Sequence, residues 1–227
     1  ISIAQLAKAF ITLNDTDRAS NITLNQKIDD FIRPIAANER QISGANNQPC
    51  LFVEARNESE ELDAIARIIK DIQNNDEQKK RIAVAQLHNS QVSFMERELR
   101  NRNVDCVKLP SMRNRNIDEL PDFVNENITL ISTIHSLKGL ECEYVIFPRS
   151  ETTKIEFFAD TDINMNLMFV LFSRAKRRII CSYVNKNESY VYNAIRPDIE
   201  NDFFQFTNAS DYLNDKFTEE IEQPIPE

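Results

Sequence analysis

The chain has 227 residues, of which 41% are hydrophobic and 28% charged, the balance of one globular domain with a sizeable core. Its formal net charge of −9 argues against a chain that grips nucleic acid tightly by itself, because phosphate contacts supply most of the affinity of such proteins. Only two glycines are present, so no P-loop and no GxGxxG motif can be written, which excludes a self-contained P-loop ATPase.

Other features of the sequence predict neither a membrane-spanning segment nor a cysteine metal site. No apolar stretch is long enough to span a bilayer, and the first residues lack a signal peptide's basic and apolar regions. The first residue is not Met, so we expect an excised or processed piece. The cysteines form no metal-binding cluster, and most lie in apolar segments, which predicts buried free thiols in a reducing, cytoplasmic compartment. They are Cys50, Cys106, Cys142 and Cys181.

Short apolar runs alternate with stretches of helical periodicity along most of the chain. The expected strands are 11–13, 50–53, 81–85, 104–109, 128–132, 144–147 and 178–183. The expected helices are 20–37, 58–72, 90–101, 136–138 and 164–174. This alternation predicts an α/β domain over residues 1–200, in three layers, with helices on both faces of a mainly parallel sheet. Residues 201–227 are expected to form an acidic C-terminal tail, partly disordered.

The most informative segment, Thr133–Glu141, lies at a strand-to-helix turn between two expected strands. In open parallel sheets, such turns line the ligand crevice. The segment reads TIHSLKGLE and resembles motif V of UvrD/Rep-like superfamily 1 DNA helicases, whose pattern is close to T-x-H-x-x-K-G-L-E. The match is long and has no gaps.

This resemblance implies roles for individual residues. In that family the glutamate bonds the nucleotide ribose, which implies a ribose contact for Glu141, with Lys138 and Gly139 beside it in the nucleotide site. The first part of the motif touches single-stranded DNA, which implies DNA contacts for Thr133 and His135. Taken alone, His135 has the alternative of a hydrogen-bonded histidine at a turn.

A second segment, Asn166–Arg178, is similar to motif VI of the same family, roughly L-x-Y-V-A-x-[ST]-R-A-[KR]. An arginine that closes an apolar helix can reach across a domain cleft and stabilise charge on a transferring γ-phosphoryl group, so Arg174 is the candidate arginine finger. Phe169 stands where the family usually has Tyr, and no role is transferred to Asn166. Residues 176–178 have the alternative of a solvated helix end.

The segment Asp17–Ile22 resembles motif IV, N-Y-R-S-x-x-x-I, with Asp17 in place of the aromatic residue and one residue fewer before Ile22. The match implies a second arginine finger at Arg18. The alternative is a surface arginine paired with Asp15 or Asp17.

The segment Ile82–Gln91 resembles the family's strand and R-[ST]-N-x-Q turn, which meets single-stranded DNA. Leu87 occupies the usual arginine position, so one phosphate contact is expected to be lost. Asn89 is a candidate DNA contact, with helix capping as the alternative.

The resemblance covers roughly residues 8–184 and implies the C-terminal RecA-like (2A) domain of a helicase, without the accessory 2B domain. It implies that ATP and Mg²⁺ bind mainly to a separate N-terminal RecA-like domain, over which Arg18, Arg174 and Glu141 close. The implied partner is single-stranded DNA, with 3′ to 5′ movement, and the chain alone is expected to have no ATPase.

Two other interpretations stay open. A helicase-like interaction module without motor activity is favoured by the acidic balance, Leu87 and Asp17. An unrelated nucleotide-binding α/β domain would need a phosphate loop that the sequence lacks.

Overall fold

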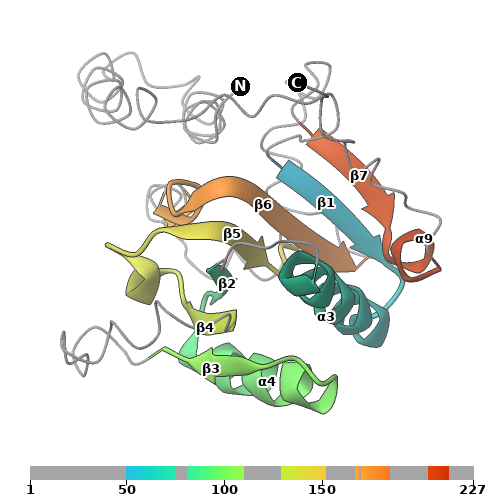
Figure 1. The fold of residues 1–227 in the computed structure, drawn as a ribbon, viewed down its shortest axis with the longest axis horizontal. Coiled ribbons are helices and arrows are strands. Elements are labelled where there is room, and N and C mark those ends of the chain that lie inside the picture. The colour runs from blue at the N-terminus through green and yellow to red at the C-terminus, as the bar shows by residue number, and fades with distance from the viewer. Residues whose placement is uncertain are drawn as a thin grey trace, which may run out of the picture.

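A seven-stranded sheet forms the centre of the protein (Figure 1), with strand order β3-β4-β2-β5-β6-β1-β7. The computed structural model describes residues 50–74, 81–109, 129–151, 167–168, 170–184 and 204–214. Every pair of neighbouring strands is parallel, which confirms the predicted parallel sheet. The expected strand 11–13 and helix 20–37 lie outside the described residues.

Most of the expected elements are present, with their ends shifted by a few residues. In chain order the described elements are β1 (Cys50–Ala55), α3 (Glu58–Asn74), β2 (Ile82–Gln86), α4 (Asn89–Asn101), β3 (Cys106–Lys108), β4 (Thr129–Thr133), the 3-10 helix η3 (His135–Leu137), β5 (Cys142–Phe147), β6 (Ala175–Val184), β7 (Phe204–Asn208) and α9 (Ala209–Leu213), of which β7 and α9 were not predicted. The largest shift is at β6, which includes residues 176–178, so these are not a solvated helix end.

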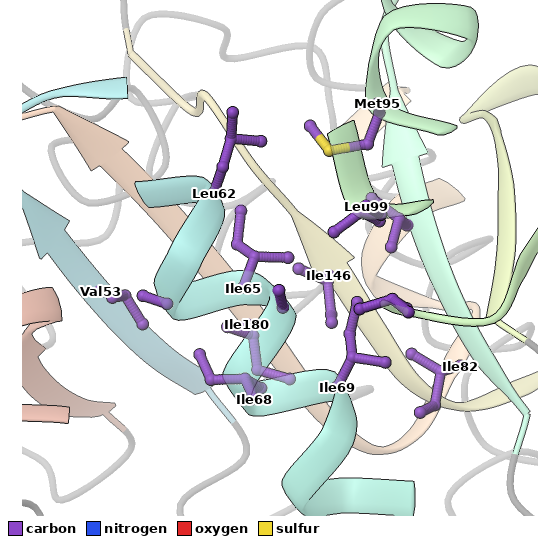
Figure 2. Packing of buried hydrophobic residues seen from close by; sticks show 14 of the residues in the cluster. Val53, Leu62, Ile65, Ile68, Ile69, Ile82, Met95, Leu99, Ile146 and Ile180 are labelled. Carbon is purple, nitrogen blue, oxygen red and sulfur yellow. The ribbon is translucent and has the colours of Figure 1, made fainter. Parts of the chain in front are cut away.

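Helix α3 covers one face of the sheet because its isoleucines recur at helical spacing. Ile65, Ile68 and Ile69 are buried and point toward Ile146 and Ile180 of the sheet (Figure 2). Burying each of these side chains contributes about 1.5–3 kcal/mol. The first turn of the helix is acidic, which complements the positive end of the helix dipole.

The opposite face of the sheet is also apolar, because alternate residues of each strand point to opposite sides. In β1, Leu51 and Val53 pack on the α3 side, whereas Phe52 belongs to a second buried cluster. Leu171 and Phe172, at the end of the expected helix 164–174, are fully buried in that cluster. Apolar packing on both faces agrees with the predicted three layers.

The sheet continues past residue 200, where the sequence placed the start of an acidic tail. Strand β7 pairs in parallel with β1, and Figure 1 shows it with α9 at one end of the sheet. The ring of Phe206 stacks on Phe52 with centroids 5.2 Å apart, and the Tyr212 hydroxyl donates to Asp71 of α3 over 3.1 Å. These contacts explain why residues 204–214 join the domain despite their acidic surroundings.

All four cysteines are buried free thiols, as predicted. Within the described ranges, no helix combines the length and the apolar character needed to cross a membrane.

A buried carboxylate, Glu61 of α3, lies beneath the ends of β5 and β6. Its side chain is 1% exposed, and Oε1 accepts hydrogen bonds from the Ser182 hydroxyl at 2.6 Å and from the Arg149 backbone N–H at 2.8 Å. Oε2 has no hydrogen-bond partner among the described residues. Burial, reinforced by the nearby charge of Glu151, raises the pKa of Glu61 to about 7. The folded protein therefore holds a proton here to near-neutral pH.

This pKa predicts that the free energy of unfolding falls as pH rises. The unfolded carboxyl titrates near 4.5, so the stabilisation from Glu61 is fully present below that pH and is lost as pH rises through about 7. The loss is on the order of 3 kcal/mol. Glu61→Gln keeps both hydrogen-bond acceptor contacts and does not titrate, so its urea unfolding should depend less on pH between 4.5 and 8. Equal pH dependence in the two proteins would contradict the buried proton.

Candidate functional site

The residues expected to form the site lie at two opposite edges of the sheet. Thr133 ends β4, His135 follows it, and Asn89 follows β2, all at the edge where strands end. Glu141 immediately precedes β5 and Arg174 immediately precedes β6, at the edge where strands begin. Because the strands are parallel, these are different sides of the domain. We call them the carboxyl edge and the amino edge.

At the amino edge, Glu141 and Arg174 are held side by side by the backbone. The N–H of Cys142 donates to the carbonyl of Arg174 over 2.9 Å, at the point where β5 and β6 begin to pair. The carboxylate of Glu141 forms an ion pair with Lys176 at 2.7 Å, and both side chains are well exposed. The Lys176 hydrogen bond, helped by the charges of Arg174 and Arg81, holds the pKa of Glu141 below its usual value.

The guanidinium of Arg174 is partly buried against the chain segment that precedes it. Nε donates to the carbonyl of Val170 over 3.2 Å, and Nη2 donates to the Ser173 hydroxyl over 3.0 Å. Burial lowers the pKa of Arg174 from its ordinary value, while Glu141 opposes that effect. In the part of the chain that the structure describes, Nη1 makes no hydrogen bond. Arg174 therefore keeps donors for an anion.

At the carboxyl edge, the hydroxyl of Thr133 is used inside the turn. It is 8% exposed, donates to the Ser136 hydroxyl over 3.1 Å and accepts from the Ser136 N–H over 3.3 Å. The N–H of Ile134 donates to the carbonyl of Gln86 over 2.9 Å, which fixes the turn to β2. His135 is exposed at the start of η3, so its side chain faces outward.

Asn89 is exposed in the first turn of α4 and does not cap the helix. The N-cap is His88, whose backbone N–H donates to the side chain of Gln91 over 3.0 Å. The capping alternative for Asn89 is therefore wrong. Leu87, in the position of the family's arginine, is buried in the core. The structure thus brings Asn89 and His135 to neighbouring strand ends, since β2 and β4 are adjacent.

The two edges are joined by the turn between β4 and β5, residues 134–141. Leu137 is fully buried in the same apolar cluster as Phe52 and Phe172, whereas Lys138 and Gly139 are exposed. Gly139 has φ +83°, a conformation that side-chain-bearing residues rarely adopt. This backbone reversal leads the chain to Glu141 at the amino edge.

The structure does not describe one of the expected site residues, and it adds two residues that were not expected. Arg18 lies outside the described residues. Sequence reasoning missed the pairing of Lys176 with Glu141, because it treated that lysine as part of a helix end. It also missed Arg81, which precedes β2 at the amino edge. Within the described ranges, no group of three or more His, Cys, Asp or Glu could hold a metal ion.

Comparison with known proteins identifies the fold. A family model described as an AAA domain (AAA_12) matches residues 13–184, most of the chain. No curated protein matches the sequence. The chain is similar to the C-terminal domain of a possible DNA helicase from Lactobacillus plantarum WCFS1, with a TM-score of 0.54 and 12% identity over 74% of this chain and 98% of that chain.

A second similarity is to a variant of S. cerevisiae Dbp5 bound to RNA and ADP BeF3, with a TM-score of 0.50 and 14% identity. It covers 84% of this chain and 51% of that chain, so the present sequence spans about half its length. Together the two similarities confirm the predicted fold, the RecA-like α/β fold of helicase C-terminal domains.

The backbone at Gly139 predicts a measurable effect of substitution. A Cβ there would meet nothing within 4 Å, so Gly139→Ala adds no clash and only the strain of a positive φ. We expect the free energy of unfolding to fall by about 1–2 kcal/mol, measured by urea denaturation. Gly139→Asn should be milder, because Asn tolerates this conformation. An alanine variant as stable as the wild type would show that the turn adopts another conformation.

Proposed function

The chain belongs to the AAA domain family AAA_12, and on that premise we propose that it is the C-terminal motor domain of an ATP-dependent superfamily 1 DNA helicase or translocase of the UvrD/Rep type. The observation that carries the proposal is that Glu141 and Arg174 lie next to each other at the amino edge, where the N–H of Cys142 donates to the Arg174 carbonyl. An acceptor for a ribose hydroxyl and a donor for a phosphate are thereby placed side by side. We assign the nucleotide to this edge.

Arg174 is the proposed arginine finger. Its guanidinium carries a charge and has donors that no described residue uses, which suit it to stabilise negative charge on a transferring γ-phosphoryl group. Glu141 would accept the ribose hydroxyl after exchanging its contact with Lys176, and Lys138 and Gly139 lie in the exposed turn just before it. Arg18 is retained as a second finger on the motif resemblance alone.

The substrate ATP needs a phosphate-binding loop that this sequence does not contain. Arg174 and Glu141 fit the side of the nucleotide that faces away from the phosphate-binding loop, where an arginine can contact a phosphate. The described residues offer no carboxylate cluster for Mg²⁺. We therefore assign the P-loop and Mg²⁺ to an N-terminal RecA-like domain of the same protein, where the ion would neutralise phosphate charge.

Single-stranded DNA is assigned to the carboxyl edge. His135 and Asn89 are exposed there and can donate to phosphates or stack on bases. Thr133 supports the contact by bracing the turn through Ser136. Because the chain has a formal net charge of −9, the partner domain would supply much of the positive charge that binds the strand.

The turn 134–141 connects the two ligands in this proposal. Closure of the two domains around ATP would move the amino edge, and the turn would transmit the movement to His135. Repeated closure and opening would move the protein along the strand. The resemblance makes the direction 3′ to 5′.

A helicase-like interaction module is the competing function, favoured by the burial of Leu87 where the family has an arginine. Such a module needs neither a ribose acceptor nor an arginine finger. The two functions differ in whether the full-length protein hydrolyses ATP.

Arg174→Ala in the full-length protein tests the motor. We expect the kcat of ATPase stimulated by single-stranded DNA to fall on the order of 10³-fold or more, with nucleotide affinity largely kept, because the finger acts mainly in the transition state. Arg97→Ala is the matched control, since Arg97 is 66% exposed on α4 and pairs with Glu98. If single-stranded DNA does not stimulate the ATPase of the wild type, or if Arg174→Ala is as active as the Arg97→Ala control, the motor function is contradicted and the interaction module is favoured.

A further inference from the structure

Arg81 lies at the amino edge, and none of the four motif resemblances assigns it a role. It immediately precedes β2, just as Glu141 precedes β5 and Arg174 precedes β6. These three strands are consecutive in the sheet. The register between β5 and β6 places Glu141 beside Arg174. The register between β2 and β5 places Arg81 beside Glu143, so Arg81 lies at the same edge, two residues along β5 from Glu141.

The backbone of Arg81 is fixed by Glu143. The Arg81 N–H donates to the Glu143 carboxylate over 2.8 Å, and the Arg81 carbonyl accepts from the N–H groups of Glu143 at 3.0 Å and Tyr144 at 3.2 Å. The carboxylate of Glu143 thus bonds the main chain of Arg81. This arrangement fixes the position of Arg81 through its main-chain atoms.

The guanidinium of Arg81 forms no ion pair or hydrogen bond with residues that the structure describes. The other nearby carboxylate, Glu141, forms its ion pair with Lys176 at 2.7 Å. The charge of Arg81 nevertheless reaches Glu141, whose pKa is lowered first by Lys176, then by Arg174 and Arg81. Arg81 is partly buried, and a guanidinium that has no partner among the described residues and lies near two further cations favours an anionic ligand.

We propose that Arg81 binds a phosphate group of ATP at the amino edge, beside Arg174. The proposal rests on the proposed function, because it places the nucleotide at the same edge. A guanidinium can hold two phosphate oxygens at once, which an ammonium group cannot do with the same geometry. Arg81 binds the nucleotide in the ground state and the transition state alike, whereas Arg174 acts on the developing charge.

This difference gives Arg81 its own kinetic signature. In the full-length protein with single-stranded DNA, Arg81→Ala should raise the KM for ATP about tenfold with kcat within about threefold of wild type, because uniform binding is lost. Affinity for a fluorescent ATP analogue should fall by a similar factor. Arg81→Lys should recover part of it, and Arg97→Ala should match the wild type.

Three outcomes separate the possibilities. A KM within about twofold of wild type in Arg81→Ala, while Arg174→Ala loses hydrolysis, would overturn the role of Arg81 and leave the motor intact. An unchanged KM for ATP together with weaker binding of single-stranded DNA would also overturn it, because Arg81 would then contact a phosphate of the DNA and not of ATP. An inactive wild type or indifferent Arg174→Ala would instead defeat the proposed function.

Urea unfolding identifies any variant that fails to fold. If Arg81→Ala fails to fold, the KM of Arg81→Lys for ATP tests the proposal instead, because lysine keeps the charge and lacks the paired donors of the guanidinium. A KM raised severalfold supports the proposal, and a wild-type KM overturns it.

Discussion

The parallel direction of the strands is the constraint on which the candidate site depends. In a parallel sheet every strand begins at one edge and ends at the other, so residues before strands and residues after strands lie on opposite sides. Glu141 and Arg174 precede strands, whereas His135 and Asn89 follow them. The segment Thr133–Glu141, although continuous in sequence, therefore contributes to two separate surfaces. An antiparallel arrangement would have mixed these residues.

The turn after β4 is the physical link between the surfaces, and its two ends are fixed differently. Near β4, the Thr133 hydroxyl and the hydrogen bond from Ile134 to Gln86 hold it to the sheet. Near β5, the backbone of Cys142 holds it beside Arg174. Between them, buried Leu137 anchors the turn, and Gly139 allows the reversal of direction. Movement at one edge thus has a short, packed route to the other.

The sequence was informative wherever a pattern was local. Helical spacing predicted α3 and α4, apolar runs predicted the central strands, and the motif V segment lies at a strand end as expected. Local patterns could not predict β7, because its place depends on Phe206 meeting Phe52 from a distant part of the chain. The acidic composition of residues 201–227 predicted a tail and not a strand.

Side-chain roles were harder to predict than elements. The sequence does not reveal that the hydroxyl of Thr133 turns inward to Ser136, or that His88 and not Asn89 caps α4. Both depend on backbone geometry that several sequences share. The contacts of Arg81 and Lys176 could not be predicted, because their partners Glu143 and Glu141 are brought to them by a neighbouring strand.

The most direct test of the two-edge arrangement is a crystal structure of the full-length protein with a non-hydrolysable ATP analogue and a single strand of DNA. We predict that the triphosphate lies within hydrogen-bond distance of Arg174 and the ribose at Glu141, and that the DNA strand crosses the opposite edge at His135. Both ligands at one edge, or a nucleotide that contacts neither Glu141 nor Arg174, would contradict it.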